Sequence, residues 1–401
     1  MNASRPVLVL ALHHGALGIA RSLGRLGVPV YGATDDPSIA AARSRYFRDV
    51  FSWSPRDPVK AVDRLVQFGE RFERPLLLPT SDATTILVED HADRLRGVFE
   101  FRPRPPGLAR ALSSKRAMYE LCLQHDVSTP RTVFPASVAE AVSLLGDLAL
   151  PVVLKPVDAS TVPASVGVTA TIAASRDEAL AVVRRLPGNV LMQEYIPGGS
   201  ESVWMFNGYF DENGDCLFGI TGRKLRQHPV SGGVTSLGQC VHNDVVQETT
   251  RRFMSAVGYR GILDCGYRYD ARDGAYKLLD VNPRIGSTFR LFVDSAGLDV
   301  ARVWYRDLTG QRVEVGEGVE GRRWLVEDID LVSSFRYMRT GALGPRAWLR
   351  SVRKVDERAW LARDDMTPAL RLPAFRIKSR LTRFARAFSL RPIRRKERPC
   401  R

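Results

Sequence analysis

The residues best suited to chemistry by type and spacing lie in the segment 276–284. It reads YKLLDVNPR, so an acid, an amide and a cation occupy positions 280, 282 and 284 at the end of an apolar run. In a β-strand, side chains two residues apart lie on the same face. Asp280 and Asn282 would therefore direct oxygen ligands to one point, with Arg284 beyond them on the same face. Such ligands suit a divalent cation that carries phosphate.

A second apolar segment, residues 262–267, contains one acid, Asp264, and residues 270–274 between the two segments are typical of a hairpin turn. The hairpin would bring Asp264 near Asp280. A purely structural interpretation stays open: Asp280 ends a strand, Asn282 and Pro283 open a turn, and Asp264 is a satisfied polar group.

Two lysines lie where a protein could hold an anion. Lys115 precedes a predicted helix over 116–125, and a cation at a helix start opposes the helix dipole unless an anion is bound or the side chain is solvent-exposed. Lys155 ends an apolar strand and is followed by a loop, 158–167, rich in Ser, Thr, Ala and Pro. Its backbone N–H groups could cover phosphates, although Gly167 is its only glycine.

Residues 190–201 predict a strand, a linker and the start of a second strand. An adenine ring needs an apolar slot beside an exposed backbone N–H and C=O, and a ribose needs an acceptor such as a carboxylate. Tyr195 and Ile196 could supply the slot, and Glu194 or Glu201 the acceptor. A plain strand end and turn is the alternative.

Clustered cations lie between glycines at residues 222–238, among them Arg223, Lys224, Arg226 and His228. This composition predicts a loop that grips an anionic substrate, or alternatively a solvated basic loop.

The N-terminal residues 5–110 alternate apolar strands with helical patterns, which predicts a parallel α/β sheet. The turn at residues 13–18 has glycines spaced GxxG and leads into a helix whose N-terminus could hold an anion. His13 and His14 are interpreted as turn residues, although either could touch a carboxylate or phosphate there. An NAD(P)-dependent enzyme is a weaker alternative, because the GxGxxG pattern is incomplete and only Asp35 and Asp36 could bind the ribose.

Composition indicates a soluble globular protein of two or three packed units, with 401 residues and 44% hydrophobic side chains. No run approaches the ~20 apolar residues of a spanning helix. The apolar run at 6–12 is broken by His13, His14 and Gly15, which argues against a signal peptide, so we expect a cytoplasmic location. The five scattered cysteines predict neither a disulfide framework nor a zinc site.

The net charge of +15 is concentrated at the C-terminal end. Residues 371–401 contain twelve Arg or Lys and the single acid Glu397, so +11 of the total lies there. We therefore do not expect nucleic-acid binding from the overall charge.

Taken in chain order, six motifs resemble those of the ATP-grasp superfamily, and more closely those of the bacterial carboxylate-amine ligase-like ATP-grasp proteins, a group that includes D-aspartate ligases. The motifs are Lys115, Lys155, residues 193–198 (QEYIPG), Arg223 with Lys224, Asp264, and residues 280–284 (DVNPR). The match extends from the N-terminal α/β unit to about residue 311.

The resemblance implies an α/β and α+β fold. An N-terminal Rossmann-like parallel sheet (1–110) would precede an ATP-grasp domain (111–311, with subdomains of about 111–190 and 191–311) and a helical, basic C-terminal extension (312–401). It also implies an ATP-dependent ligase that uses magnesium, for which manganese could substitute. The enzyme would phosphorylate a small-molecule carboxylate, and an amine would attack the acyl phosphate. A homodimer is compatible with the resemblance.

For the nucleotide, the resemblance implies that Lys115 and Lys155 hold the α- and β-phosphates. Glu194, Tyr195 and Ile196 would form the adenine hinge, and Glu201 would bind the ribose hydroxyls.

For the reaction, the resemblance implies that Asp280 and Asn282 bind magnesium and that Arg284 neutralises the moving phosphoryl group. Arg223 and Lys224 would meet the substrate carboxylate.

One position departs from the family pattern. The acid of the first metal strand usually stands directly before an aromatic residue, but here Gly266 precedes Tyr267. Asp264, two residues earlier on the same face, is the nearest carboxylate and is expected to reach the ion. This departure favours a second hypothesis, an ATP-binding protein of the same fold with weak or no catalysis and a regulatory role.

Residue Arg290, after the metal strand, could bind the carboxylate or acyl phosphate, or form a structural ion pair. Residues 312–370 show helical patterns, and Trp324, Trp348 and Trp360 are expected to pack onto the body of the protein.

Towards the end of the chain, Ile377, Leu381, Phe384 and Phe388 have helical spacing among basic residues. They predict an amphipathic basic helix that could contact the inner face of an anionic membrane through residues 374–398. A docked or frayed terminal helix with solvated charges is the alternative.

Overall fold

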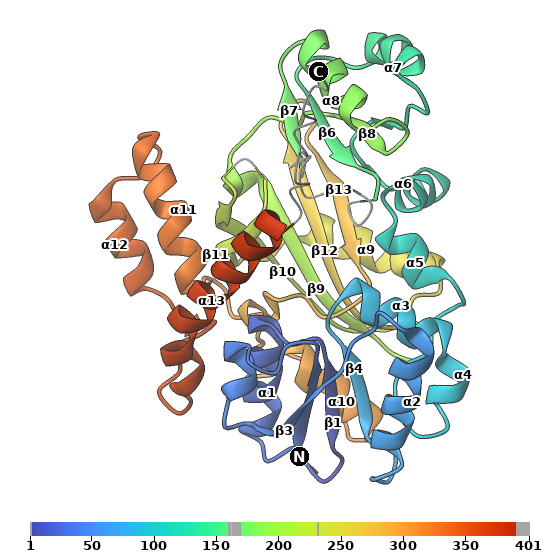
Figure 1. Ribbon diagram of the computed structural model, residues 1–401, viewed down its shortest axis with the longest axis vertical. Coiled ribbons are helices and arrows are strands. Elements are labelled where there is room, and N and C mark those ends of the chain that lie inside the picture. Colours follow the sequence, from blue (N-terminus) through green and yellow to red (C-terminus); the bar gives the residue numbers. More distant parts are fainter. Residues whose placement is uncertain (1, 159–161, 163–169, 231, 390–401) are drawn as a thin grey trace, which may run out of the picture.

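The computed structural model describes residues 2–158, 162, 170–230 and 232–389, with side chains described as far as Lys378. Most of the predicted phosphate-covering loop at 158–167 therefore lies outside the described residues. The described chain contains three β-sheets, which lie one above another in Figure 1. The N-terminal sheet is at the bottom, the largest sheet in the middle and a small sheet at the top.

The N-terminal sheet is parallel, as predicted, with strand order β3-β2-β1-β4. Its strands β1, β2 and β4 are short, apolar and mostly buried because helices cover both faces, whereas the edge strand β3 is largely exposed. The strands are β1 (Val7–Leu10), β2 (Val30–Thr34), β3 (Phe47–Ser52) and β4 (Leu76–Pro79). The helices are α1 (His14–Gly24), α2 (Pro58–Gly69), α3 (Asp82–Asp90) and α4 (Ala92–Leu95), with a 3₁₀ turn, η1 (Ala40–Arg43).

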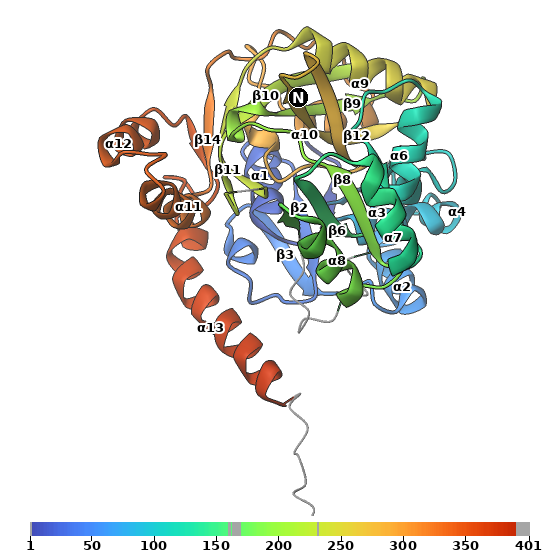
Figure 2. The same ribbon diagram turned by 90° about the horizontal axis from the view of Figure 1, so that it is seen from above.

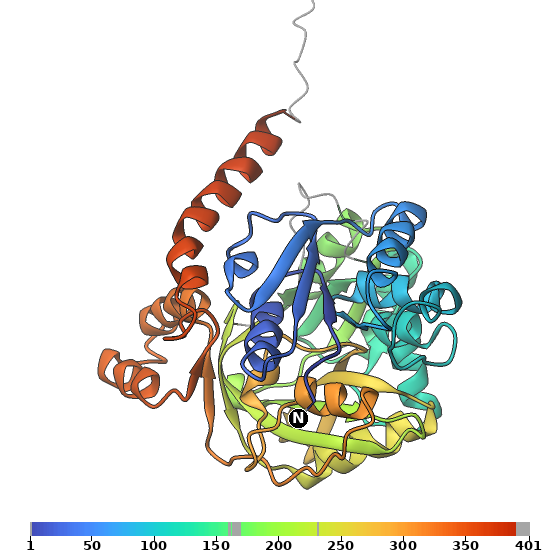
Figure 3. The ribbon, with the colours of Figure 1, turned by 90° about the horizontal axis from the view of Figure 1, so that it is seen from below.

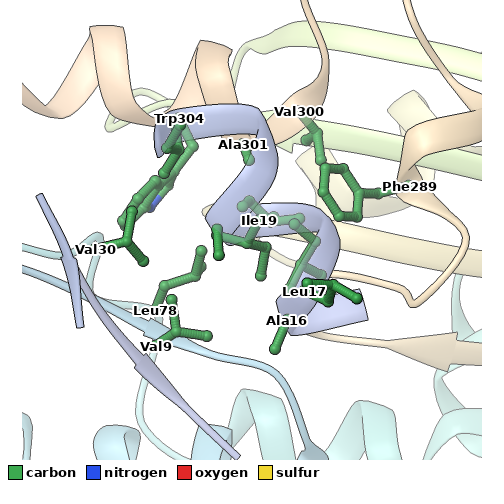
Figure 4. Packing of buried hydrophobic residues seen from close by; sticks show 14 of the residues in the cluster. Val9, Ala16, Leu17, Ile19, Val30, Leu78, Phe289, Val300, Ala301 and Trp304 are labelled. Atoms are coloured by element: carbon green, nitrogen blue, oxygen red, sulfur yellow. The ribbon is translucent and has the colours of Figure 1, made fainter. Parts of the chain in front are cut away.

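Helix α1 lies at the centre of the largest core. Figure 4 shows its residues Ala16, Leu17 and Ile19 between the strands of this sheet and the side chains of Val300 and Trp304. These last two residues belong to α10 (Val300–Leu308), which is far away in the sequence. One apolar core therefore joins the N-terminal unit to the later part of the chain.

The second sheet is small and antiparallel, with order β5-β8-β6-β7. Its strands are β5 (Thr132–Val133), β6 (Val152–Pro156), β7 (Thr171–Ala173) and β8 (Val190–Glu194). Helices α7 (Val138–Leu144) and α8 (Arg176–Arg185) contribute to its own core, with the 3₁₀ turn η2 (Leu145–Asp147). Helices α5 (Leu108–Ser113) and α6 (Lys115–Gln124) lie between this sheet and the N-terminal unit (Figure 1).

The third sheet has seven strands in the order β13-β12-β9-β10-β11-β14-β15. Five long antiparallel strands form most of it: β9 (Val203–Phe210), β10 (Cys216–His228), β11 (Val234–Cys240), β12 (Gly261–Asp270) and β13 (Ala275–Asn282). Helix α9 (Asp244–Ala256) packs in a core with one face. The 3₁₀ turns η4 (Ser200–Ser202) and η5 (Phe289–Leu291) lie before β9 and after β13.

The C-terminal extension is helical, as predicted, but it also supplies two strands. Strand β14 (Arg323–Leu325) pairs with β11, and β15 (Glu357–Arg358) pairs with β14. The three helices are α11 (Glu327–Arg339), α12 (Pro345–Arg353) and α13 (Thr367–Ser389). Figures 2 and 3 show α13 leaving the body of the protein at an angle. The division into domains at residues 110, 190 and 311 stays a prediction.

Buried contacts fix the beginning of the extension to α1. The Arg21 guanidinium is 2% exposed; its Nε donates to Asp365 at 2.9 Å and its Nη atoms donate to the carbonyls of Ala359 and Trp360. The rings of Trp324 and Trp360 lie each 6.0 Å from the ring of His14. Both tryptophans are buried, as expected from the sequence.

Among the described residues, no helix has both the length and the apolar character needed to cross a membrane. The predicted terminal helix is confirmed as far as Ser389. Of its predicted apolar face, only Ile377 lies among the described side chains, and it is 61% exposed.

The buried histidine on α1 predicts acid sensitivity. Burial, followed by the charges of His13 and Arg376, lowers the pKa of His14 from 6.5 to about 3. Between these values an unfolded chain binds one more proton than the folded one, so the free energy of unfolding falls as the pH falls below about 6.5. From pH 7 to pH 5, His14 should contribute about 2 kcal/mol of this loss.

The variant His14→Leu should therefore lose less stability than the wild type between pH 7 and pH 5, as measured by urea unfolding at several pH values. His242→Leu, at an exposed position, controls for the loss of a surface histidine. Parallel pH profiles for His14→Leu and the wild type would contradict the assignment.

Candidate active site

The hairpin β12–β13 positions the predicted metal-binding residues. Asp264 lies directly opposite Asn282, and Gly266 lies opposite Asp280. The turn that joins the strands contains Gly274, whose φ of +71° is favourable only for a residue without a side chain. The predicted hairpin is therefore present, and it brings Asp264 near Asp280, as expected, although Asp264 pairs with Asn282.

The three side chains converge. The Asn282 Nδ2 atom donates to Asp280 Oδ2 at 3.1 Å and faces Asp264 Oδ2 at 3.4 Å. Asn282 Oδ1 accepts from Arg284 Nη2 at 2.9 Å, while Arg284 Nε donates to Asp82 Oδ1 at 2.9 Å. Asp82 is the first residue of α3, so the N-terminal unit reaches this point as well.

A β-bulge and a glycine determine where the Asp280 carboxylate lies. The register shifts between Gly266 and Tyr267, because Tyr267 pairs with Leu278 rather than with Leu279. Bulges bend a strand and redirect side chains near functional sites. A Cβ atom at position 266 would lie 2.2 Å from Asp280 Oδ1, so the space of the missing side chain is filled by the Asp280 carboxylate.

Three lysines from three different elements lie within electrostatic reach of Asp280. Lys115 begins α6, Lys155 lies in β6 and Lys224 lies in β10. Burial lowers the pKa of all three lysines, and the negative charge of Asp280 partly opposes this shift in each case. The charge of Lys115 also lowers the pKa of Lys155, which shows that the cations are close enough to repel one another. An anion would relieve this repulsion.

The lysine amines are loosely held. Lys115 Nζ donates to the Val157 carbonyl at 3.3 Å, Lys155 Nζ to Gln193 Oε1 at 3.1 Å, and Lys224 Nζ to the Gly233 carbonyl at 2.6 Å. Each of these partners is neutral. The lysines can therefore turn towards a phosphate or carboxylate without breaking an ion pair.

Burial raises the pKa of Asp264 to about 7, and the nearby charge of Asp280 raises it further, whereas Arg284 and Lys224 oppose the shift. Two carboxylates this close together disfavour simultaneous ionisation, although Asp280 is exposed to solvent. A divalent cation would favour the ionised form of both.

The donor set at the hairpin fits magnesium. The described residues contain no group of three or more His, Cys, Asp or Glu side chains that could hold a metal ion. Two carboxylates and one amide do converge, and magnesium commonly binds through one or two carboxylates while the substrate phosphates supply further ligands. Asp264, Asp280 and Asn282 would hold such an ion.

The predicted adenine hinge lies at the end of β8. The Glu194 carboxylate accepts hydrogen bonds from the Arg131 N–H, Lys277 and Arg272, at 3.0 to 3.2 Å, so it is already engaged. Its side chain therefore stabilises this segment, whereas Glu201 is exposed, and its contact with a ribose stays a prediction. Ile196 is 4% exposed, and its contact with an adenine ring stays a prediction.

Analysis of the sequence missed Arg268. This residue follows Asp264 and Gly266 on the same face of β12, and its Nη2 donates to the Gly198 carbonyl. Its Nε is buried without a partner among the described residues. Its charge lowers the pKa of Lys155 and Lys224, and Tyr195 and Glu201 lie within its electrostatic reach. Its spacing of four residues from Asp264, which places both on one face of a strand, could have identified it.

The prediction for residues 222–238 needs correction. The segment is not a flexible loop, because most of it forms β10 and β11. Lys224 shares the sheet face of Asp264, whereas Arg223 points to the opposite face with Trp204. Arg223 therefore does not join Lys224 at the carboxylates.

Other polar candidates are structural. Arg226 forms a buried ion pair with Asp330 at 2.7 Å. Arg290 is paired with Asp299 and with Glu357, the latter at 2.6 Å, which decides between the two alternatives for this residue.

His13 caps α1. Its Nδ1 accepts from the Gly15 N–H at 2.9 Å, its Nε2 lies 3.3 Å from the Thr80 carbonyl, and burial lowers its pKa to about 4. With His14 packed against tryptophans, both histidines are turn and packing residues, as interpreted from the sequence.

No protein-family model matches the sequence. The chain is similar to D-aspartate ligase of Enterococcus faecium (strain Aus0004), with 26% identity over 74% of each protein.

The structure resembles solved ligases and carboxylases. L-amino acid ligase from Bacillus licheniformis matches with a TM-score of 0.58 and 15% identity over 80% of this chain and 76% of that one. The biotin carboxylase domain dimer of 2-oxoglutarate carboxylase from Hydrogenobacter thermophilus, in complex with MgADP, ADP and bicarbonate, matches with a TM-score of 0.59 and 14% identity over 79% and 72%. The ATP-grasp fold predicted from the sequence is thereby confirmed.

The close approach of Gly266 to Asp280 predicts the effect of a small substitution. In Gly266→Ala the new methyl group would force the Asp280 carboxylate away from Asn282, so we expect affinity for Mg²⁺ or Mn²⁺ to fall by about tenfold, on the scale of a lost charged interaction. Calorimetric titration in the presence of ADP would measure it. Gly146→Ala is the matched control, because the nearest atom to its new Cβ is 3.9 Å away. Equal cation affinity in both variants would show that Asp280 is not a ligand.

Proposed function

We propose that this chain, which has the ATP-grasp fold and is related to a D-aspartate ligase, is an ATP- and magnesium-dependent ligase that joins a carboxylate to an amine. One observation carries the proposal. Lys115, Lys155 and Lys224 lie within electrostatic reach of Asp280, beside a second carboxylate and a guanidinium. Clustered cations next to convergent oxygen ligands suit a nucleotide phosphate chain and its metal ion.

The nucleotide would lie between the second and third sheets. Lys115 and Lys155 would hold the α- and β-phosphates, since both are partly desolvated and their hydrogen-bond partners among the described residues are neutral. The backbone from Glu194 to Ile196 would contact the adenine, and Glu201 the ribose. Arg268, beneath the same region, would add a further cation near the phosphates.

Magnesium, held by Asp264, Asp280 and Asn282, would neutralise the phosphate oxygens during transfer. The side chains of this chain would do the remaining work. Arg284, fixed by Asp82 and Asn282, would stabilise the charge that develops on the transferred phosphoryl group. Lys224 would orient the substrate carboxylate.

The proposed reaction has two steps. A carboxylate oxygen of the first substrate attacks the γ-phosphorus of ATP, the bond to the β-phosphate bridging oxygen breaks, and ADP leaves. The amine nitrogen of the second substrate then attacks the carbonyl carbon of the acyl phosphate. Inorganic phosphate leaves and the amine loses a proton, which yields an amide.

The relatives suggest the class of substrate. Both D-aspartate ligase and L-amino acid ligase act on amino acids, so we propose that an amino acid supplies the carboxylate or the amine and that D-aspartate is the first to test.

The second hypothesis, an ATP-binding protein with weak catalysis, is favoured by Gly266. The room for a side chain at this position is taken by Asp280, so the first-strand acid is Asp264, two residues earlier than in the family pattern. A homodimer, a cytoplasmic location and peripheral membrane contact through residues 374–398 stay predictions.

The test is ADP release by the full-length protein with ATP and magnesium, over pools of amino acids and other small carboxylates that include D-aspartate. We expect release to depend on one pool and to fall by at least about 100-fold in Asp280→Ala and in Lys155→Ala, the scale of removing one group that stabilises the transition state. Asp93→Ala, at an exposed position on α4, is the control.

Substantial activity in both site variants would contradict the proposal. An absence of ADP release with every pool, together with stabilisation of the wild type against thermal unfolding by ATP, would favour the second hypothesis.

A further inference from the structure

A second cation-rich site lies away from the predicted active site. A cavity of about 560 Å³ opens where the C-terminal end of α1 meets η5 and the segment around β15. Six lining residues are arginines: Arg21, Arg25, Arg290, Arg322, Arg358 and Arg363. Three are acids, and Asp365 and Asp299 behind the lining neutralise Arg21 and Arg290, so an excess charge of +1 remains. The volume lies within the range of small-molecule sites, roughly 300–1,000 Å³.

Two of the three acids that line the cavity, Glu357 and Asp364, already form ion pairs with its arginines. Glu357 accepts from Arg290 Nε at 2.8 Å and from Arg322 Nη2 at 2.6 Å. Asp364 accepts two hydrogen bonds from Arg25, at 2.8 and 2.9 Å. These pairs hold three guanidinium groups in fixed positions, so a ligand would not have to order them.

Two of the arginines are left with unused hydrogen-bond donors. The Arg358 side chain has one hydrogen bond within the described part of the chain, from Nη2 to the Val352 carbonyl at 3.4 Å. Arg363 is exposed and forms no ion pair or hydrogen bond with any described residue. Each guanidinium presents five N–H donors in a planar fork that matches phosphate oxygens.

The cavity is separate from the predicted nucleotide site. Arg21 and Arg25 lie at the C-terminal end of α1, whereas His14, at its other end, lies next to the capping residue His13 near Ser287. A helix of 11 residues spans about 16 Å. A ligand in the cavity therefore cannot be the nucleotide held by Lys115 and Lys155, although α1 and the segment 283–291 connect the two sites.

We propose that this arginine-lined cavity binds a small organic molecule that carries two or more phosphate groups. The excess positive charge calls for an anion, and the unused guanidinium forks favour phosphate over an isolated carboxylate. Several arginines line a cavity of about 560 Å³, which favours a ligand with more than one phosphate.

Pyrophosphate and tripolyphosphate are suitable probes, used with full-length protein carrying Lys155→Ala and Lys224→Ala so that the lysine cluster does not report the binding. Calorimetric titration at low ionic strength should show saturable binding of tripolyphosphate. The further pair Arg358→Ala and Arg363→Ala should weaken it at least tenfold. Arg346→Ala, an exposed arginine on α12 outside the cavity, should change it less than twofold.

A second variant separates occupancy of the cavity from simple loss of charge. Ala362→Trp fills the cavity without removing a cation, so it should also weaken binding at least tenfold. The proposal is overturned if tripolyphosphate does not bind, or if it binds equally to the Arg358→Ala, Arg363→Ala protein and to its parent. Equal binding to these two proteins would assign the binding to the basic C-terminal segment. Unchanged affinity in Ala362→Trp would overturn it as well.

Discussion

The crowding of cations is the constraint on which the site depends, since Lys115 repels Lys155 and Arg268 repels both Lys155 and Lys224. Lys115, Lys155 and Lys224 come from a helix and two different sheets, and the carboxylate of Asp280 is the anion that acts on all of them. Like charges brought together in a poorly solvated site are unfavourable unless opposite charge is nearby. The position of Asp280 is therefore central to the balance of charge, and the bulge in β13 and the absence of a side chain at Gly266 make that position available. The phosphate groups of a nucleotide would add negative charge to that of the Asp280 carboxylate and so neutralise the lysines further.

Much of this arrangement could be predicted from the sequence because it follows from local periodicity. The two-residue spacing of Asp280 and Asn282, the turn at Gly274 and the parallel strands β1, β2 and β4 depend on neighbours in the chain. The predictions were wrong where the register between distant strands determines the face on which a side chain lies. Arg223 and Lys224 are adjacent, and only pairing with β9 shows that Lys224 alone shares the face of Asp264. The strands of the C-terminal extension could not be predicted for the same reason, since two- and three-residue segments become strands only when a sheet edge accepts them.

The site also depends on a hydrophobic core that extends across the predicted domain boundaries. Residues of α1, of β9 and β10, of α10 and of the C-terminal extension form a single cluster of buried side chains. Asp82 reaches Arg284 from the N-terminal unit across the same junction. The geometry at the hairpin therefore depends on packing between parts that are distant in sequence, and a mutation in the core of the N-terminal unit can disturb chemistry that takes place on the third sheet.

The buried pair formed by Arg21 and Asp365 joins residues that are 344 positions apart. A buried cation without its partner is strongly unfavourable. During synthesis on the ribosome, Arg21 emerges first and has no carboxylate, and no carbonyl of Ala359 or Trp360, to receive it until almost the whole chain has been made. N-terminal units commonly fold first as a chain is translated. Here α1 reaches its final packing only after residues 359–365 have been synthesised. Until then the nascent protein is only partly assembled.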